Sequence, residues 1–166
     1  TVAAGGLSYR AHYNGSTTYA EADGPCEPLT GTVTPRNPSV STDVHNSAHQ
    51  PILSAPVRTV VHDSATVTGV AGGPTPTGTV KFFLCQPAEV TAGGCEGNAG
   101  TQIGTPAAGE TLNGSGVAQS ESTANTTAIG KYCWRAEYSG DGFYSPSSHT
   151  NTDSECFTTQ PQAPVI

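Results

Sequence analysis

Residues 132–138 read YCWRAEY, and this stretch decides the fold class. Its large apolar side chains stand at every second position, whereas a cysteine, an arginine and a glutamate occupy the positions between them. Neighbouring side chains of a β-strand point to opposite faces of the sheet, so the alternation predicts a strand with one face in a core. Residues 79–85, TVKFFLC, form the most apolar run of the chain, and we expect them in the middle of a sheet.

Further strand signals follow at even intervals, separated by turn residues such as glycine, proline and an Asn-Gly pair. They are expected at residues 40–45 together with 57–62 as a split first strand, and at 65–69, 102–105, 110–112, 117–122 and 155–159. A loop over residues 86–100 carries Cys95, and we find no convincing helical pattern. The predicted fold class is therefore all-β, an antiparallel sandwich of short strands.

Composition excludes several classes of function. The 166 residues include 6 Lys and Arg against 13 Asp and Glu, which gives a formal net charge of −7. This leaves no basic surface for nucleic acid or anionic lipid, so no nucleic-acid partner is expected. No apolar run approaches the length of a membrane span, so no membrane insertion is expected. The chain opens at Thr1 without a charged and apolar leader, and we expect a mature or excised portion of a longer protein.

Cysteine usage indicates the compartment. The chain has five cysteines and no methionine, and its short strands bury little apolar surface, a combination typical of secreted domains stapled by disulfides. The alternative is a cytosolic protein with five reduced, buried thiols. The oxidising interpretation is preferred, and it predicts a disulfide-stapled domain at an extracellular or cell-surface location.

Two segments of the chain resemble each other. Residues 7–29, LSYRAHYNGSTTYAEADGPCEPL, align with residues 132–157, YCWRAEYSGDGFYSPSSHTNTDSECF. The alignment places Cys26 opposite Cys156, 130 positions further on, which is about the length of one sandwich. The segments are therefore interpreted as one unit present twice. Chance similarity between two tyrosine-rich hairpins is the alternative.

This alignment predicts the domain organisation. Residues 1–30 would be the last two strands of an incomplete preceding copy, and residues 31–42 a Pro- and Thr-rich linker. Residues 43–160 would be a complete copy, and residues 161–166 a tail or the start of the next linker. Since a hairpin without the rest of its sandwich exposes unpaired edges, we expect residues 1–30 to be completed by another polypeptide or to be unstable alone.

Three phrases are similar to the tandem Ig-like repeats of large bacterial surface and secreted proteins of the actinobacterial type. They are VHDSATVTG at residues 61–69, PTGTVKFF at residues 76–83 and RAEYSGDGFY at residues 135–144. The resemblance implies an Ig-like antiparallel β-sandwich, and a role in adhesion or spacing at a cell surface. It supplies no catalytic residue and no cofactor.

The Ig-like arrangement also implies a disulfide pairing. The third strand of such a sheet lies beside the sixth, which would place Cys85 near Cys133 and leave Cys95 for Cys156. The first copy has a serine where Cys133 would stand yet keeps Cys26, so Cys133 and Cys156 are expected in different bridges and Cys26 with a partner outside this chain. The alternative joins Cys85 to Cys95 and Cys133 to Cys156, and it closes smaller loops.

Two groups of residues have the composition of a chemical site. Residues 62–64, His-Asp-Ser, contain the residue types of a catalytic triad, but strand neighbours point to opposite faces, so no catalytic residue is expected. His45 and His49 have the spacing of a zinc pair on a helix, yet their flanks are β-rich, so no metal site is expected. Asp141 is expected to stabilise a turn rather than to bind calcium.

Aromatic residues provide the one candidate ligand surface. Trp134, Tyr138 and Tyr144 are candidates for carbohydrate binding, although the alternation would place about half of the aromatic side chains in the core. The surface requires that several of these residues be exposed together.

The expected function is a structural or adhesive repeat of an extracellular stalk or fibre, without catalysis or cofactor. Its expected partners are neighbouring repeats or subunits of the same protein, and a surface glycan or protein is considered as well. Two alternatives remain open. The chain is a filament subunit that polymerises by inter-subunit strand completion, or it is a carbohydrate-binding module.

Overall fold

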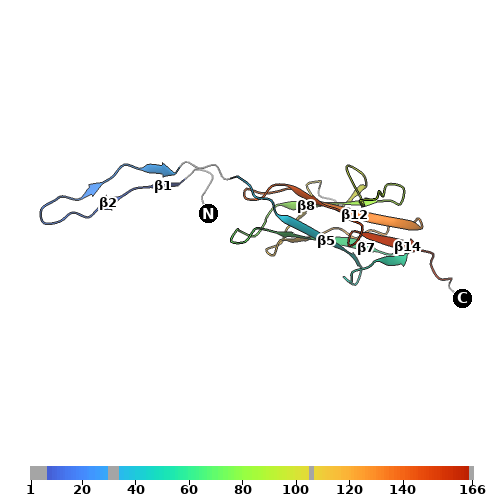
Figure 1. Cartoon of the computed structure of the whole chain (residues 1–166). Coiled ribbons are helices and arrows are strands. Elements are labelled where there is room, and N and C mark those ends of the chain that lie inside the picture. Colours follow the sequence, from blue (N-terminus) through green and yellow to red (C-terminus); the bar gives the residue numbers. More distant parts are fainter. Residues whose placement is uncertain (1–6, 30–33, 105–106, 165–166) are drawn as a thin grey trace. The chain divides into compact units, whose positions relative to one another are not determined.

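The computed structural model of the chain describes residues 7–29, 34–104 and 107–164. The chain divides into two compact units, Thr1–Thr34 and Pro35–Ile166, which we call the hairpin unit and the sandwich unit. The described residues form strands, turns and loops but no helix (Figure 1). The all-β class predicted from the alternating patterns is confirmed.

The hairpin unit is one antiparallel hairpin with two short ladders. Strand β1, Leu7–Tyr9, pairs with β4, Glu27–Leu29. Strand β2, His12–Tyr13, pairs with β3, Ala22–Asp23, and the side chains of these two strands are exposed. Among the described residues of this unit no apolar side chain is buried, so this part of the hairpin has no core. An isolated two-stranded hairpin of this kind is at best marginally stable in water.

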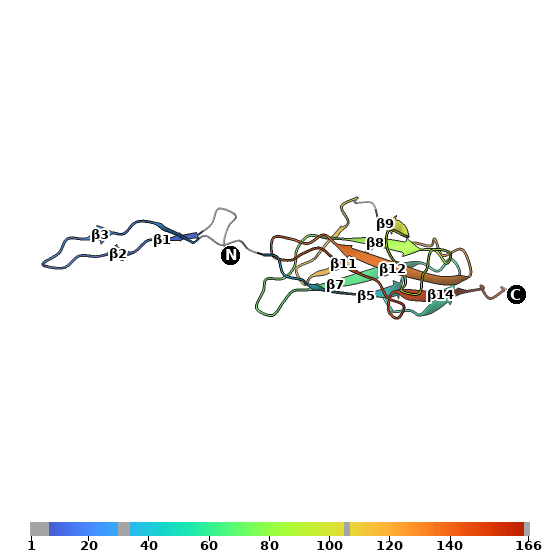
Figure 2. The same ribbon diagram turned by 45° about the horizontal axis from the view of Figure 1, so that its top comes forward.

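The sandwich unit has two sheets (Figures 1 and 2). The larger has seven strands in the order β10, β8, β12, β14, β6, with β13 beside β12 and β9 beside β8. These are β6 (Ser54–Pro56), β8 (Thr79–Cys85), β9 (Thr101–Ile103), β10 (Glu110–Thr111), β12 (Gly130–Tyr138), β13 (Ser147–His149) and β14 (Cys156–Gln160). The smaller has three, in the order β11 (Val117–Gln119), β7 (Val61–Thr68), β5 (Ser39–Asn46). The named strands pair antiparallel, except that β14 and β6 run parallel.

The core lies between these sheets and is filled from alternate positions of their strands. Strand β12 contributes Tyr132, Trp134, Ala136 and Tyr138, none of them more than 2% exposed. The alternation read from the sequence is therefore confirmed. The same core also holds Phe82, Leu84 and Phe157 from the larger sheet, and Val44, Val61, Ala65 and Val67 from the smaller one. Because both sheets contribute, neither could bury its apolar face without the other.

The strand prediction is right for the strongest signal and for the first half of the split strand, residues 40–45, which lie within β5. It is wrong for the beginning of the second half, residues 57–60. Residues 79–85 form β8 as predicted. Residues 57–58 form a turn instead of a strand, and Arg58 adopts a φ of 64°, a left-handed conformation that a strand cannot contain. Strand β7 begins after this turn, at Val61, and incorporates most of the strand predicted at 65–69.

The predicted linker also differs from the structure at its end. It was expected over residues 31–42, but β5 begins at Ser39 and pairs with β7 from that residue on. Residues 31–33 of this prediction, and residues 165–166 of the predicted tail, lie outside the described residues.

The preferred disulfide pairing is wrong, and the alternative is the one found. Cys85 is bonded to Cys95, and Cys133 to Cys156. Cys133 is nevertheless next to Cys85, as expected, because it stands directly opposite Cys85 on one side and opposite Cys156 on the other.

The pleat of the sheet explains which neighbour is bonded. The Cα atoms of Cys133 and Cys156 are 4.1 Å apart, the close spacing of a pair that is not hydrogen-bonded. In an antiparallel sheet the N–H and C=O of one residue point toward the same neighbouring strand. Those of Cys133 therefore point toward Cys85, and a hydrogen-bonded pair of this kind has the wider Cα spacing. The disulfide closes across the narrow side.

Candidate functional site

One end of the sandwich unit carries a loop that receives two tyrosines. The loop is Gly69–Gly78, between β7 and β8, and we call its contact with Tyr138 and Tyr144 the tyrosine seat. The Tyr144 hydroxyl donates to the carbonyl of Pro74 at 2.7 Å, and the Tyr138 hydroxyl donates to the carbonyl of Thr77 at 2.7 Å. Burial, followed by the charge of nearby Asp141, raises the pKa of Tyr138 to about 12, so this hydroxyl remains a donor.

Glycine is required where the Tyr144 ring meets this loop. A Cβ atom added at Gly69 or at Gly73 would overlap the Tyr144 hydroxyl. The seat therefore depends on two glycines four residues apart as well as on the aromatic side chain. The sequence gives no sign of this requirement, because glycine and proline between two strand signals indicate only a turn.

Asp141 fastens the turn that presents Tyr144 to the seat. Its Oδ1 accepts the backbone N–H groups of Phe143 and Tyr144 at 2.7 and 2.8 Å, and its Oδ2 accepts the N–H and hydroxyl of Thr77 at 2.8 and 2.9 Å. Burial would raise the pKa of Asp141, but these hydrogen bonds outweigh it and hold the pKa below its usual value. The carboxylate thus stabilises the turn, as the sequence predicted, and ties it to the receiving loop.

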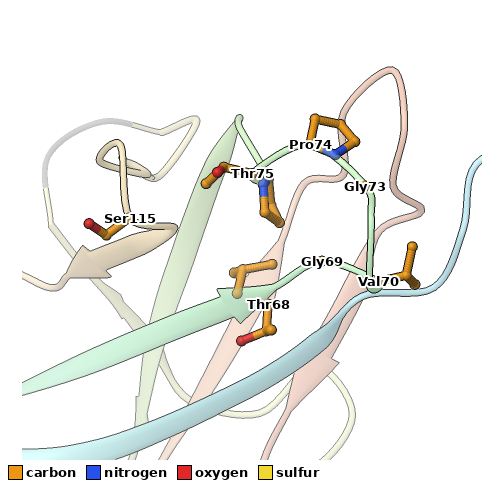
Figure 3. Close-up of a pocket in the computed structure, with 9 residues that line it drawn as sticks. Thr68, Gly69, Val70, Gly73, Pro74, Thr75 and Ser115 are labelled. Carbon is orange, nitrogen blue, oxygen red and sulfur yellow. The ribbon is translucent and has the colours of Figure 1, made fainter.

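A small open hollow of about 240 Å³ adjoins the seat. Figure 3 shows the loop through Gly73 and Pro74 on one side of it and Ser115 on the other. The lining is made of backbone, threonine, proline, glycine and valine atoms together with Ser115, without a titratable side chain. The hollow can offer hydrogen bonds but no acid or base for catalysis.

The two disulfides form a second feature, which we call the disulfide clamp. Its four sulfur-bearing residues are between 0% and 4% exposed and pack in one cluster, apart from the main core. Arg135 lies on the same outer side of β12. Its guanidinium stacks over the Phe83 ring at 4.2 Å, donates to the carbonyl of Ala99 at 2.9 Å and forms an ion pair with Glu137. The clamp and this arginine together hold the loop over residues 86–100 against the sheet.

Two carboxyl groups are buried within the sandwich. Asp63 and Glu155 are both 0% exposed, and neither Asp63 Oδ2 nor Glu155 Oε2 has a hydrogen-bond partner. Burial, reinforced by the charges of Asp63 and Asp43, raises the pKa of Glu155 to about 10. Burial also raises the pKa of Asp63. Protonated, neutral carboxyl groups satisfy this environment better than two buried charges would.

His149 connects Glu155 to Thr42, and the hydrogen bonds define its tautomer. Asn151 Oδ1 accepts the N–H groups of residues 153, 154 and 155, so Asn151 Nδ2 is the group that donates to His149 Nε2, at 3.3 Å. The proton of neutral His149 is then on Nδ1, which lies 2.9 Å from Thr42 Oγ1 and 3.2 Å from Glu155 Oε1. In this tautomer His149 cannot take a proton from the Thr42 hydroxyl, so the group does not have the arrangement of an activated nucleophile.

Three histidines meet on the outer face of the smaller sheet. His45 stands opposite His62, and His49 Nδ1 lies 3.1 Å from His62 Nε2. Burial, and then the charges of His49 and His45, lowers the pKa of His62. The sequence singled out His45 and His49 but placed His62 with a different group. Among the described residues, no cluster of histidine, cysteine or carboxylate side chains has the arrangement of a metal site.

The predicted ligand surface is also wrong. Trp134, Tyr138 and Tyr144 are 0%, 2% and 1% exposed and belong to the core. Exposed aromatic residues are found instead in the hairpin unit, where Tyr9, Tyr13 and Tyr19 are 62%, 48% and 69% exposed. The separation of His62 from Asp63 was predicted correctly, since Asp63 lies in the interior beside Val44 while His62 meets the histidines of the outer face.

The fold and these features define a class, the disulfide-stapled β-sandwich. Comparison with known proteins adds no relative, because neither a family model, nor a curated protein, nor a solved structure matches the chain. Within the described ranges, no helix is long and apolar enough to cross a membrane.

Proposed function

We propose that the chain is a structural module of an extracellular surface stalk or fibre, in which the sandwich unit serves as a load-bearing spacer without catalysis. The observation that carries this proposal is the path of the chain through the sandwich unit. The chain enters the unit beside the turn that contains Tyr144, where Arg36 and Tyr144 form an isolated β-bridge. It leaves the unit after β14, at the opposite end (Figures 1 and 2). A tension applied through neighbouring modules would therefore run along the strands.

The pairing of β14 suits such a load. It lies between β12, with which it pairs antiparallel, and β6, with which it pairs in parallel. The ladder hydrogen bonds cross from strand to strand, perpendicular in the antiparallel pair and slanted in the parallel one, so a pull along β14 strains all of them at once instead of opening them one after another. Strands loaded in this direction separate only at a higher force than strands peeled from one end.

The disulfide clamp limits what a load can extend. The Cys133–Cys156 bridge joins β12 to the first residue of β14, so the 23-residue separation between these cysteines cannot be drawn out while the bridge is intact. By the chain-entropy relation, the two bridges, with separations of 10 and 23 residues, stabilise the fold by about 3 kcal/mol each. Two buried structural disulfides indicate an oxidising, extracellular environment.

The surface of the sandwich unit also favours a spacer over a ligand receptor. Among its described residues, the exposed large apolar side chains are Leu53, Val60 and Ile129, which come from separate loops. The residues predicted to stack on a sugar, Trp134, Tyr138 and Tyr144, are in the core. The carbohydrate-binding alternative therefore gains no support from the described residues of the sandwich unit.

Pulling single molecules in two directions tests the proposal. Handles at residues 35 and 164 load the sandwich unit from end to end. Handles at residues 35 and 142 load the same folded unit, with the same disulfides, from two points at one end, because Arg36 lies beside the turn that contains residue 142. We expect a clearly higher unfolding force for the first geometry. Equal forces, or a lower force from end to end, would show that the unit is not built to carry tension along its strands.

A further inference from the structure

The tip of the hairpin unit has the same turn as residues 138–147 of the sandwich unit. In the hairpin, Ser16 N–H donates to the carbonyl of Tyr19 at 2.7 Å; in the sandwich unit, Asp141 N–H donates to the carbonyl of Tyr144 at 2.9 Å. The side chain of Ser16 accepts the N–H of Tyr19, as the side chain of Asp141 accepts that of Tyr144. The glycines before these residues, Gly15 and Gly140, both adopt left-handed conformations, with φ of 79° and 75°.

The strands beside the two turns also pair in the same register. Tyr13 stands opposite Ala22 and His12 opposite Asp23. A shift of 125 positions turns these into Tyr138 opposite Ser147 and Glu137 opposite Ser148, which are the pairs of β12 with β13. Hydrogen bonds, turn conformation and register therefore agree over the tip of the hairpin.

The surroundings of the matched residues differ completely. Tyr13 and Tyr19, 48% and 69% exposed, correspond to Tyr138 and Tyr144, which are buried. The other face of the hairpin is polar, since Arg10 and His12 both contact the carboxylate of Asp23, at 3.3 and 2.6 Å. The hairpin is thus amphipathic, with a tyrosine face that has the shape of a core-facing strand pair.

We infer that the tyrosine face of the hairpin unit binds a sandwich body of the same construction, one that has the equivalents of β5, β7 and β8 but not of the last hairpin. The sandwich unit indicates the contacts. Tyr19 would donate to a loop carbonyl as Tyr144 does to Pro74, and Tyr13 would donate as Tyr138 does to Thr77.

The same comparison specifies the chemistry of the partner. Its receiving loop needs glycine at the positions of Gly69 and Gly73, because any Cβ there would collide with a seated tyrosine. Its first segment needs free backbone groups at the position of Arg36, which donates to the carbonyl of Phe143 at 2.8 Å and accepts the N–H of Ser145 at 3.0 Å. Thr18 and Ala20 would supply the matching groups of the hairpin.

This inference gives the proposed spacer a specific neighbour, but it rests on the hydrogen bonds and burial within each unit and not on load-bearing. The hairpin could bind such a body even if the sandwich unit resisted no tension. A failure of the pulling experiment and a failure of the experiment below are therefore distinguishable.

The test supplies the missing body from this chain itself. Residues 35–131 are joined directly in front of Leu7, in place of residues 1–6, so that Leu7 follows residue 131 as Tyr132 does in the sandwich unit. We expect a second cooperative unfolding transition. Nitration of the hairpin tyrosines by tetranitromethane, mapped by mass spectrometry, should slow at least about tenfold relative to the natural chain, because only opened molecules would react. The matched control carries Tyr13→Ala and Tyr19→Ala in the same graft and should lose the second transition.

A second variant tests the same correspondence within the natural sandwich unit. In the natural chain, residues 138–147 are replaced by residues 13–22, a segment of equal length. This exchange keeps both tyrosines of the seat but replaces Asp141 by serine, Phe143, which packs against the core, by threonine, and Pro146 by glutamate, besides smaller changes. Because the turn and both seat tyrosines are kept, we expect a cooperative sandwich unit whose Tm stays within roughly 10 °C of the natural one. An exchange variant without a cooperative transition overturns the inference. A graft whose tyrosines react as fast as those of the natural chain overturns it as well.

Discussion

Reduction of the two disulfides should lengthen the unfolded sandwich unit by a fixed amount. The bridges Cys85–Cys95 and Cys133–Cys156 span separations of 10 and 23 residues. An extended chain gains at most about 3.6 Å per residue, so after subtraction of the short Cα separations the loops hide roughly 30 Å and 80 Å. Pulling between residues 35 and 164 should therefore give a final length about 110 Å greater for the reduced protein than for the oxidised one.

The magnitude of this difference also identifies the pairing. Paired substitution of Cys85 and Cys95 by serine should release the shorter loop alone, about 30 Å, and paired substitution of Cys133 and Cys156 the longer one, about 80 Å. The crossed pairing expected from the sequence would instead hide roughly 210 Å, because residues between Cys95 and Cys156 would be bypassed. A measured difference near that larger value, or no difference, would refute the reasoning.

Three further outcomes follow from single features of the structure. Gly69→Ala should lower the free energy of unfolding by about 2 kcal/mol in urea titrations, because the added atom would overlap the Tyr144 hydroxyl. The control Gly142→Ala has open space around the added atom and should change the free energy of unfolding little. Equal losses in the two variants would contradict the tyrosine seat. Burial raises the pKa of Glu155 to about 10 in the folded chain against a usual 4.5, so its stabilising effect is fully present below pH 4.5 and is lost as the pH rises through 10. Glu155→Gln should therefore flatten the fall in the free energy of unfolding between pH 5 and 10, measured by urea titration, by up to about 1 kcal/mol per pH unit. Parallel profiles would exclude Glu155 as the source. The native chain should present one thiol to Ellman's reagent, that of exposed Cys26, and a higher count without reductant would contradict the two bridges.

Local patterns were sufficient where one strand is long and one of its faces is apolar. Residues 79–85 and 132–138 alternate strongly, and both are strands with the expected face in the core. They were not sufficient for β13, whose residues Ser147–His149 are a strand only because they pair with β12. Nor did they exclude a strand at 57–62, because the apolar spacing there gives no sign that Arg58 would turn left-handed.

The errors about the candidate sites have a common physical origin. Cys133 was correctly expected beside Cys85, but the choice between its two neighbours depends on which side of β12 is narrow, and sequence does not contain that information. The burial of Tyr144 depends on Gly69 and Gly73, which lie some seventy positions earlier in the chain. In both cases the outcome is determined by a contact between distant segments.

The two matched turns separate what is local from what is not. The glycine with positive φ, the serine or aspartate after it and the tyrosine three residues further on form the same hydrogen bonds in both units, although one turn is exposed and the other is buried. The turn is therefore encoded by its own residues. Burial of its tyrosine is not, since it requires a glycine-bearing loop contributed by another part of the fold. A segment whose turn forms without its partner, and whose tyrosines remain exposed until a suitable loop is present, has the properties that a connector between modules needs.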